Sequence, residues 1–266
     1  AKGYAVCANP ARSFGEGRVD GWKAVQPASN LNLSSVLFAS SAKAASSDTV
    51  ESDTIASGTA MTLRFDGTGK NIGTVTYNNT TGDIKATKGS SEGDVALVVQ
   101  GKDGTNDWYY SKKIDAAETV NASDIKSALS LTSDIDLSAC KIWLEITDTD
   151  GMIYAVGATE VLSITSVEIT GIDTPVSNTA LDTEASCATT GVSSTTPQIT
   201  WTPSDSTAGY NTSYTASITL TAGTGYEFID STTATVLGNS ATSVTKNDDG
   251  TLTVTYAFPA TANDKL

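Results

Sequence analysis

Alternating apolar and polar residues recur in short stretches along this chain, which is the pattern of half-buried β-strands. Between residues 60 and 160 these stretches are separated by turn sequences rich in Gly, Asp and Asn. In residues 60–67 the alternation places Met61, Leu63 and Phe65 on one face. Residues 95–99 are instead continuously apolar, which predicts a central strand covered on both faces.

Two hairpins and one helix are predicted within this first half. Residues 72–87 are expected to fold back at the turn 78–82, and residues 140–161 at Thr149-Asp150-Gly151. Residues 120–131 carry the spacing of a helix of about two turns, with Ile125 on its apolar stripe and Ser123 expected as its N-cap. We expect this helix to be a connector.

A second set of strands begins near residues 160–165 and recurs at intervals of about ten to fifteen residues, the rhythm of an immunoglobulin-like sandwich. Trp201 is expected to be buried, and residues 247–250 form a strong hairpin turn. The residues that alternate after this turn predict a core face; they are Leu252, Val254, Tyr256 and Phe258.

These patterns predict an all-β protein with two consecutive β-sandwich domains. The first domain is expected over residues 34–162 and contains the short helix; the second, over residues 163–266, is expected to be immunoglobulin-like. Residues 1–33 carry two of the six prolines and are predicted to form an extended N-terminal tail strand.

Composition argues against several classes of function. The net charge of −14 would repel the phosphates of nucleic acids and anionic lipids, so neither is expected as a partner. The sequence has no apolar run of about 18 residues, so no membrane insertion is expected. The chain contains no histidine, the commonest general base and metal ligand, so we expect neither an enzyme nor a cofactor.

Three adjacent aromatic residues, Trp108, Tyr109 and Tyr110, are the candidate ligand-binding residues. Exposed aromatic rings can stack on sugars, so they could form a carbohydrate-binding platform. In a strand, however, Trp108 and Tyr110 share one face and Tyr109 takes the other, so at least one face is expected to lie in the core. Both interpretations remain open from the sequence.

Two further motifs have a functional and a structural interpretation. Asp148-Thr149-Asp150-Gly151 is similar to the start of a calcium loop, but the later ligands are missing and Asp is common in tight turns. Lys141, with Glu145 on the same strand face, is the lysine best placed for a self-formed Lys–Asn isopeptide bond; a solvated lysine is the alternative.

The three cysteines allow at most one disulfide within the chain. Cys140 and Cys187 lie in strand-like runs, where a free cysteine behaves as a small buried hydrophobe. Cys7 lies near the terminus and is the candidate for an intersubunit disulfide.

The second half carries motifs that resemble a known class of module: Tyr214-Thr215-Ala216, Gly225-Tyr226-Glu227-Phe228 and the run KNDDGTLTVTY at residues 246–256. They are similar to immunoglobulin-like repeats of large cell-surface proteins of Gram-positive, often gut-dwelling, bacteria. Residues 107–160 also look like a module of such proteins, so the resemblance covers most of residues 34–266. The resemblance implies an extracellular location at the bacterial cell surface.

The same resemblance implies a non-enzymatic structural module, either a stalk or a filament or pilus-like subunit. Its partners would then be other copies of itself or neighbouring modules of the same protein. Residues 12–40 more weakly resemble the end of a preceding module, and a tail strand from residues 1–33 could then be donated to a neighbouring subunit. The alternative is an adhesin or carbohydrate-binding module that recognises host or cell-wall glycans through Trp108, Tyr109 and Tyr110.

Overall fold

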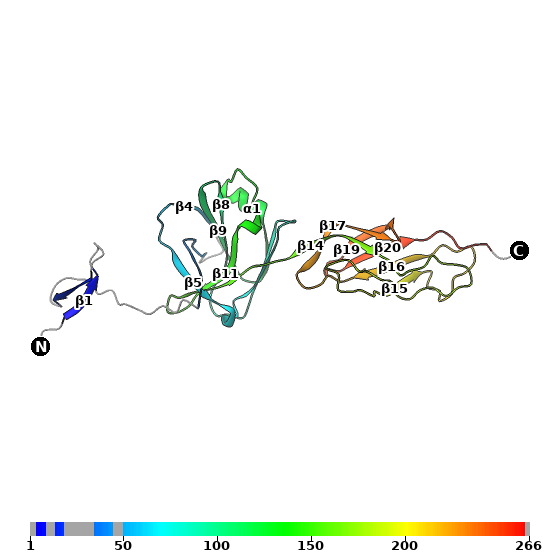
Figure 1. The fold of residues 1–266 in the computed structure, drawn as a ribbon, viewed down its shortest axis with the longest axis horizontal. Coiled ribbons are helices and arrows are strands. Elements are labelled where there is room, and N and C mark those ends of the chain that lie inside the picture. Colours follow the sequence, from blue (N-terminus) through cyan, green and yellow to red (C-terminus); the bar gives the residue numbers. More distant parts are fainter. Residues whose placement is uncertain (1–3, 9–13, 19–34, 45–49, 264–266) are drawn as a thin grey trace.

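The computed structural model describes residues 4–8, 14–18, 35–44 and 50–263. Strands dominate these residues, which contain one α-helix, so the predicted all-β fold is confirmed. Residues 35–160 and residues 162–263 form two successive β-sandwich domains, here called domain 1 and domain 2 (Figure 1). Each has its own hydrophobic core, and the predicted boundary at 162/163 falls at the start of the first strand of domain 2.

Within the predicted tail, the structure describes two strands, β1 (Tyr4–Ala8) and β2 (Phe14–Arg18). They pair antiparallel from Tyr4 opposite Arg18 to Ala8 opposite Phe14, so this part is a hairpin rather than a single extended strand. The remainder of residues 1–33 lies outside the described residues. Donation of a tail strand to another subunit stays a prediction.

Domain 1 consists of two sheets. The larger has the order β3-β5-β12-β11-β8-β9-β4 and the smaller the order β10-β7-β6-β13. The strands of the larger sheet are β3 (Val36–Ser40), β4 (Glu51–Ile55), β5 (Thr62–Asp66), β8 (Val95–Asp103), β9 (Asn106–Ile114), β11 (Lys141–Thr147) and β12 (Ile153–Gly157). Those of the smaller sheet are β6 (Gly73–Asn78), β7 (Asp83–Lys88), β10 (Ala117–Asn121) and β13 (Thr159–Glu160). Both predicted hairpins are confirmed, as β6–β7 and β11–β12.

Strand β8 lies between β9 and β11 and is covered on both faces, as its apolar run predicts. Val95, Leu97 and Val99 belong to the core shared with the smaller sheet. Ala96 and Val98 belong to a second cluster on the opposite face, which also contains Trp143 and Ala42. The side chains on both faces of β8 are therefore buried, which explains why its sequence does not alternate apolar and polar residues.

Strand β5 differs from the prediction. Arg64 is only 1% exposed, whereas Met61, expected on the buried face, is 61% exposed. The Arg64 guanidinium donates from Nε to Glu145 Oε2 at 2.9 Å and from Nη1 and Nη2 to the carbonyl oxygens of Ser40 and Ala42 at 2.5 and 2.6 Å. A charge can be buried when it is paired and hydrogen-bonded in this way.

The predicted helix is confirmed as α1 (Ala122–Leu129), with Ile125 fully buried beneath it. Its N-cap is Asn121 rather than Ser123, because Asn121 Oδ1 accepts hydrogen bonds from the backbone N and the Oγ of Ser123. Asn121 has the extended backbone that an N-cap requires, since it is the last residue of β10. The short 3₁₀ helices η2 (Thr68–Lys70) and η3 (Leu137–Ala139) also belong to domain 1.

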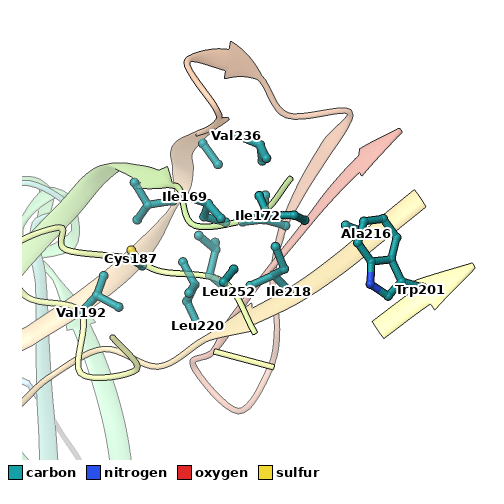
Figure 2. Close-up of a cluster of buried hydrophobic side chains, with 14 of the residues drawn as sticks. Ile169, Ile172, Cys187, Val192, Trp201, Ala216, Ile218, Leu220, Val236 and Leu252 are labelled. Carbon is teal, nitrogen blue, oxygen red and sulfur yellow. The ribbon is translucent and has the colours of Figure 1, made fainter. Parts of the chain in front are cut away.

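Domain 2 packs a sheet of order β14-β17-β18 against one of order β15-β16-β20-β19. Its strands are β14 (Leu162–Ile169), β15 (Ile199–Thr202), β16 (Thr215–Leu220), β17 (Tyr226–Val236), β18 (Asn239–Ser240), β19 (Ser243–Lys246) and β20 (Leu252–Ala257). Figure 2 shows part of the core between these sheets, with Ile169, Ile218 and Leu252 close together. The predicted turn at residues 247–250 joins β19 to β20.

The aromatic residues of domain 2 lie largely as expected. Trp201 is buried, and its indole Nε1 donates to the carbonyl oxygen of Asp182 at 2.7 Å. Its ring packs against Tyr214 and Phe258. Leu252, Val254 and Phe258 are buried, whereas Tyr256 is half-buried.

Candidate functional site: the junction between the domains

The three aromatic residues predicted as a sugar platform are all in the core. Trp108, Tyr109 and Tyr110 are 2%, 6% and 5% exposed. Trp108 and Tyr110 pack in the core between the sheets, and Tyr109 packs on the opposite face beside Trp143. Burial raises the pKa of the hydroxyl of both tyrosines. The platform interpretation is therefore wrong, because both faces of β9 are covered and no ring presents a face to solvent.

An open cavity of about 440 Å³ lies beside Trp108, between the β8–β9 turn and the segment that leads into β11. Trp108 lies against the backbone of its cross-strand partner: a Cβ placed on Gly101 would be 2.3 Å from Trp108 Cζ2. Several charged groups around the cavity are paired with one another or with hydroxyls, as in Lys102 with Asp107 and Asp136 with Ser138.

Of the two cysteines expected to be buried in strands, Cys187 is buried, whereas Cys140 is only half-buried, and neither lies in a strand. Cys187 is 1% exposed and lies beside Val192 in the core of domain 2 (Figure 2). Cys140 is a half-buried free thiol, and burial, together with the charge of Asp136, raises its pKa to about 11. At that pKa the thiol stays protonated and unreactive near neutral pH. Cys7 lies in β1, but its side chain is outside the described residues, so an intersubunit disulfide stays a prediction.

The remaining candidate motifs have structural roles. Asp148 Oδ1 accepts from the backbone N of Asp150 and of Met152, which closes the β11–β12 turn. Lys141 is exposed and Glu145 is paired with Arg64, so these two residues do not form the buried set that an isopeptide bond requires. Among the described residues, no group of three acidic or cysteine side chains is arranged to hold a metal ion. No helix in the described part of the chain is long and apolar enough to cross a membrane.

The connection between the two domains is the most constrained feature that the sequence did not reveal. Only Val161 separates β13, which pairs with β6 of domain 1, from β14, which pairs with β17 of domain 2. The backbone N of Val161 donates to the carbonyl oxygen of Tyr77 in domain 1 at 2.8 Å. The next backbone N, that of Leu162, donates to the carbonyl oxygen of Gly225 in domain 2 at 2.9 Å. Successive backbone groups are thus held by different domains.

Four polar side chains, here called the junction cluster, join the domains beside this connection: Asn78 and Lys85 from domain 1, and Ser163 and Glu227 from domain 2. Asn78 Nδ2 donates to Glu227 Oε1 at 2.6 Å and to Ser163 Oγ at 2.8 Å. Lys85 forms an ion pair with the other carboxylate oxygen of Glu227. One carboxylate on β17 therefore holds two strands of domain 1.

Asn78 is the central residue of the junction cluster. Its side chain is 2% exposed, and its Oδ1 accepts from the backbone N of Thr80 at 2.8 Å and of Thr81 at 3.2 Å. These bonds shape the β6–β7 turn, so the amide position is fixed within domain 1 before it reaches Glu227. A buried amide that is fully hydrogen-bonded in this way is costly to separate from its partners.

The junction cluster combines residues that lie far apart in the sequence, since Asn78 and Glu227 are 149 positions apart. The turn sequence Asn78-Asn79-Thr80-Thr81-Gly82 was recognisable, but nothing in it indicates a partner in domain 2. Its hydrogen bonds and ion pair fix one domain against the other. No protein-family model matches this sequence, and none of the curated proteins compared with it is a significant match.

Proposed function

We propose that this chain is a non-enzymatic structural module of an extracellular bacterial surface protein, a stalk or filament subunit whose two domains keep one relative orientation. The observation that carries the proposal is the one-residue connection at Val161, with backbone bonds to both domains. The resemblance of residues 34–266 to surface-protein modules supports the extracellular location and the immunoglobulin-like assignment of domain 2.

Domains that swing relative to one another need a few residues whose φ and ψ are free to change. Here β13 ends at Glu160 and β14 begins at Leu162, and the N–H of the intervening residue is already bonded to domain 1. Rotation about the connection would break paired backbone bonds as well as the junction cluster. A spacer benefits from this, because a fixed angle keeps its two ends a constant distance apart.

The contributions of the junction cluster differ in size. The Lys85–Glu227 ion pair is partly exposed and is expected to contribute about 1 kcal/mol or less. The bonds of the buried Asn78 amide matter more, because an unsatisfied buried donor costs about 1–3 kcal/mol. We therefore expect the orientation to depend on Glu227 mainly as the acceptor for Asn78.

A distance measurement across the junction tests the proposal. Spin labels on Thr105→Cys in domain 1 and Ser240→Cys in domain 2, both exposed, would be measured by pulsed electron spin resonance, with Cys7→Ser and Cys140→Ser as the background. The native chain is expected to give one narrow distance distribution. Glu227→Ala is expected to broaden it at least about twofold, since Asn78 then loses its acceptor.

Two matched variants separate this effect from a general loss of charge. Glu227→Gln keeps an acceptor for Asn78 and should retain most of the narrow distribution. Asp230→Ala removes another carboxylate from β17, whose ion pair with Lys246 lies within domain 2, and should leave the distribution unchanged. A broad distribution in the native chain would contradict the proposal, because the domains would then move independently.

A further inference from the structure

We infer that tension applied along the chain unfolds the two domains in a fixed order, domain 1 before domain 2. The biological use of this order rests on the proposed function as a stalk, but the order itself depends only on the fold of each domain. It follows from the directions in which the first and last strands of each domain run, because these decide whether hydrogen bonds break together or one at a time.

In domain 2 the two strands that receive the load, β14 and β20, both run away from the junction, and the load enters them at opposite ends of the domain. Strand β14 begins at the junction and pairs in parallel with β17 over seven residue pairs, from Leu162 opposite Tyr226 to Ile169 opposite Val236, in two runs separated by a register shift between Ile164 and Ser166. Strand β20 runs between β16 and β19 toward the end from which the C-terminal segment leaves (Figure 1). Tension therefore pulls β14 and β20 along their own axes in opposite directions.

Hydrogen bonds between strands lie across the strand axis. A strand pulled along that axis must slide past its neighbour, so all of its bonds bear the load and break together. In domain 2 this applies to the β14–β17 pairing and to the pairings of β20 with β16 and β19. Such shear loading requires a high force, since the bonds of each uninterrupted run, three and four residue pairs in β14–β17, must break together.

Domain 1 is loaded differently. Its first strand, β3, pairs antiparallel with β5, and β12, near the other end of the domain's chain, pairs with β5 in parallel. Consequently Val36, which begins β3, and Tyr154 in β12 both lie opposite Phe65, at the same end of the sheet. From this end of the sheet the chain continues through β13 to the junction. Tension on the N-terminal side therefore pulls Val36 away from the junction, back along the direction in which β3 itself runs.

Strand β3 is therefore peeled from β5 rather than slid along it. It is an edge strand with one neighbour, and a bulge interrupts its pairing between Val36 and Phe38. The pairs break one after another until the load reaches Ser40 and Ala42, whose carbonyl oxygens are held by Arg64. Loss of these two bonds exposes the second cluster of the core and opens domain 1, while domain 2 stays folded.

Single-molecule pulling of the full chain from its two ends tests the order. Domain 1 is the longer of the two, and each released residue adds about 3.5 Å of contour, so the two unfolding events can be told apart by length. The longer increment is expected first and at the lower force. Unfolding of domain 2 first, or of both at the same force, would overturn the inference.

Moving one pulling point within domain 2 separates the effect of strand direction from the effect of the domain's overall stability. Asp248 is exposed in the β19–β20 turn, at the junction end of domain 2. Pulling at Asp248→Cys instead of the C-terminus places both load points at one end, so that β20 is peeled. The unfolding force of domain 2 is then expected to fall to about half or less, because its bonds break in sequence. An unchanged force would show that stability, not strand direction, sets the order.

These results are separate from the test of the proposed function. A broad distance distribution across the junction would refute a rigid spacer, yet the order of unfolding would still hold, because it depends on each domain by itself. The reverse outcome would leave a rigid tandem whose response to force has another cause.

Discussion

Replacing Arg64 with alanine is expected to destabilise domain 1 by about 3–5 kcal/mol, because it leaves Glu145 charged and unpaired in the core. The side chain of Glu145 is fully buried and accepts from Arg64 and from the indole Nε1 of Trp143. The substitution also removes the donors that satisfy the carbonyl oxygens of Ser40 and Ala42. Urea unfolding followed by tryptophan fluorescence, with Trp201→Phe as the background so that the buried Trp108 and Trp143 report on domain 1, measures the loss.

A double variant distinguishes the unpaired charge from the loss of packing. Arg64→Met with Glu145→Leu replaces the pair by apolar side chains of similar length, and such replacements are often close to neutral. More than half of the stability lost in Arg64→Ala should return. A double variant as unstable as the single one would show that the bonds to Ser40 and Ala42, not the charge on Glu145, dominate.

Gly73→Ala is expected to cost about 3 kcal/mol or more and to open the β6–β7 hairpin. Gly73 has a φ of +136°, and a Cβ there would lie 2.0 Å from the carbonyl oxygen of Thr87 and 2.8 Å from the backbone N of Gly89. Both atoms belong to the backbone, so neither can move without breaking the ladder. Thermal unfolding monitored by circular dichroism gives the change in Tm.

Gly69→Ala is the matched control for this substitution. Gly69 lies in η2, four positions earlier, where a Cβ would meet nothing within 4 Å. The free energy of unfolding of the Gly69→Ala variant should change by no more than about 0.5 kcal/mol, as is usual for exposed positions. Equal effects of the two substitutions would contradict the strain argument for Gly73.

Local sequence signals predicted the strands and turns well. The continuous run Val95–Val99 indicated the doubly covered strand, and the turns at Asp150-Gly151 and Asp249-Gly250 located two hairpins, because both signals depend on neighbouring residues. The helix was found, but its cap was misplaced by two residues. Ser123 and Asn121 are both good caps, and only the end of β10 decides between them.

Features that depend on distant partners were not predictable from one sequence. Arg64 counts as polar in any alternation, and its burial depends on Glu145, 81 positions away. The burial of all three aromatic residues, Trp108, Tyr109 and Tyr110, requires that the second face of β9 is covered. The segment at Ala42 contributes to that cover. The junction cluster similarly requires the relative position of two domains, which local periodicity does not encode.

The central claim is that domain 1 and domain 2 share one orientation across Val161. Residual dipolar couplings of the backbone amides, recorded on the full chain in a weakly aligning medium, test it most directly. One alignment tensor is predicted to fit the amides of residues 50–160 and 162–263 together. Two tensors of different magnitude, one for each domain, would contradict the account.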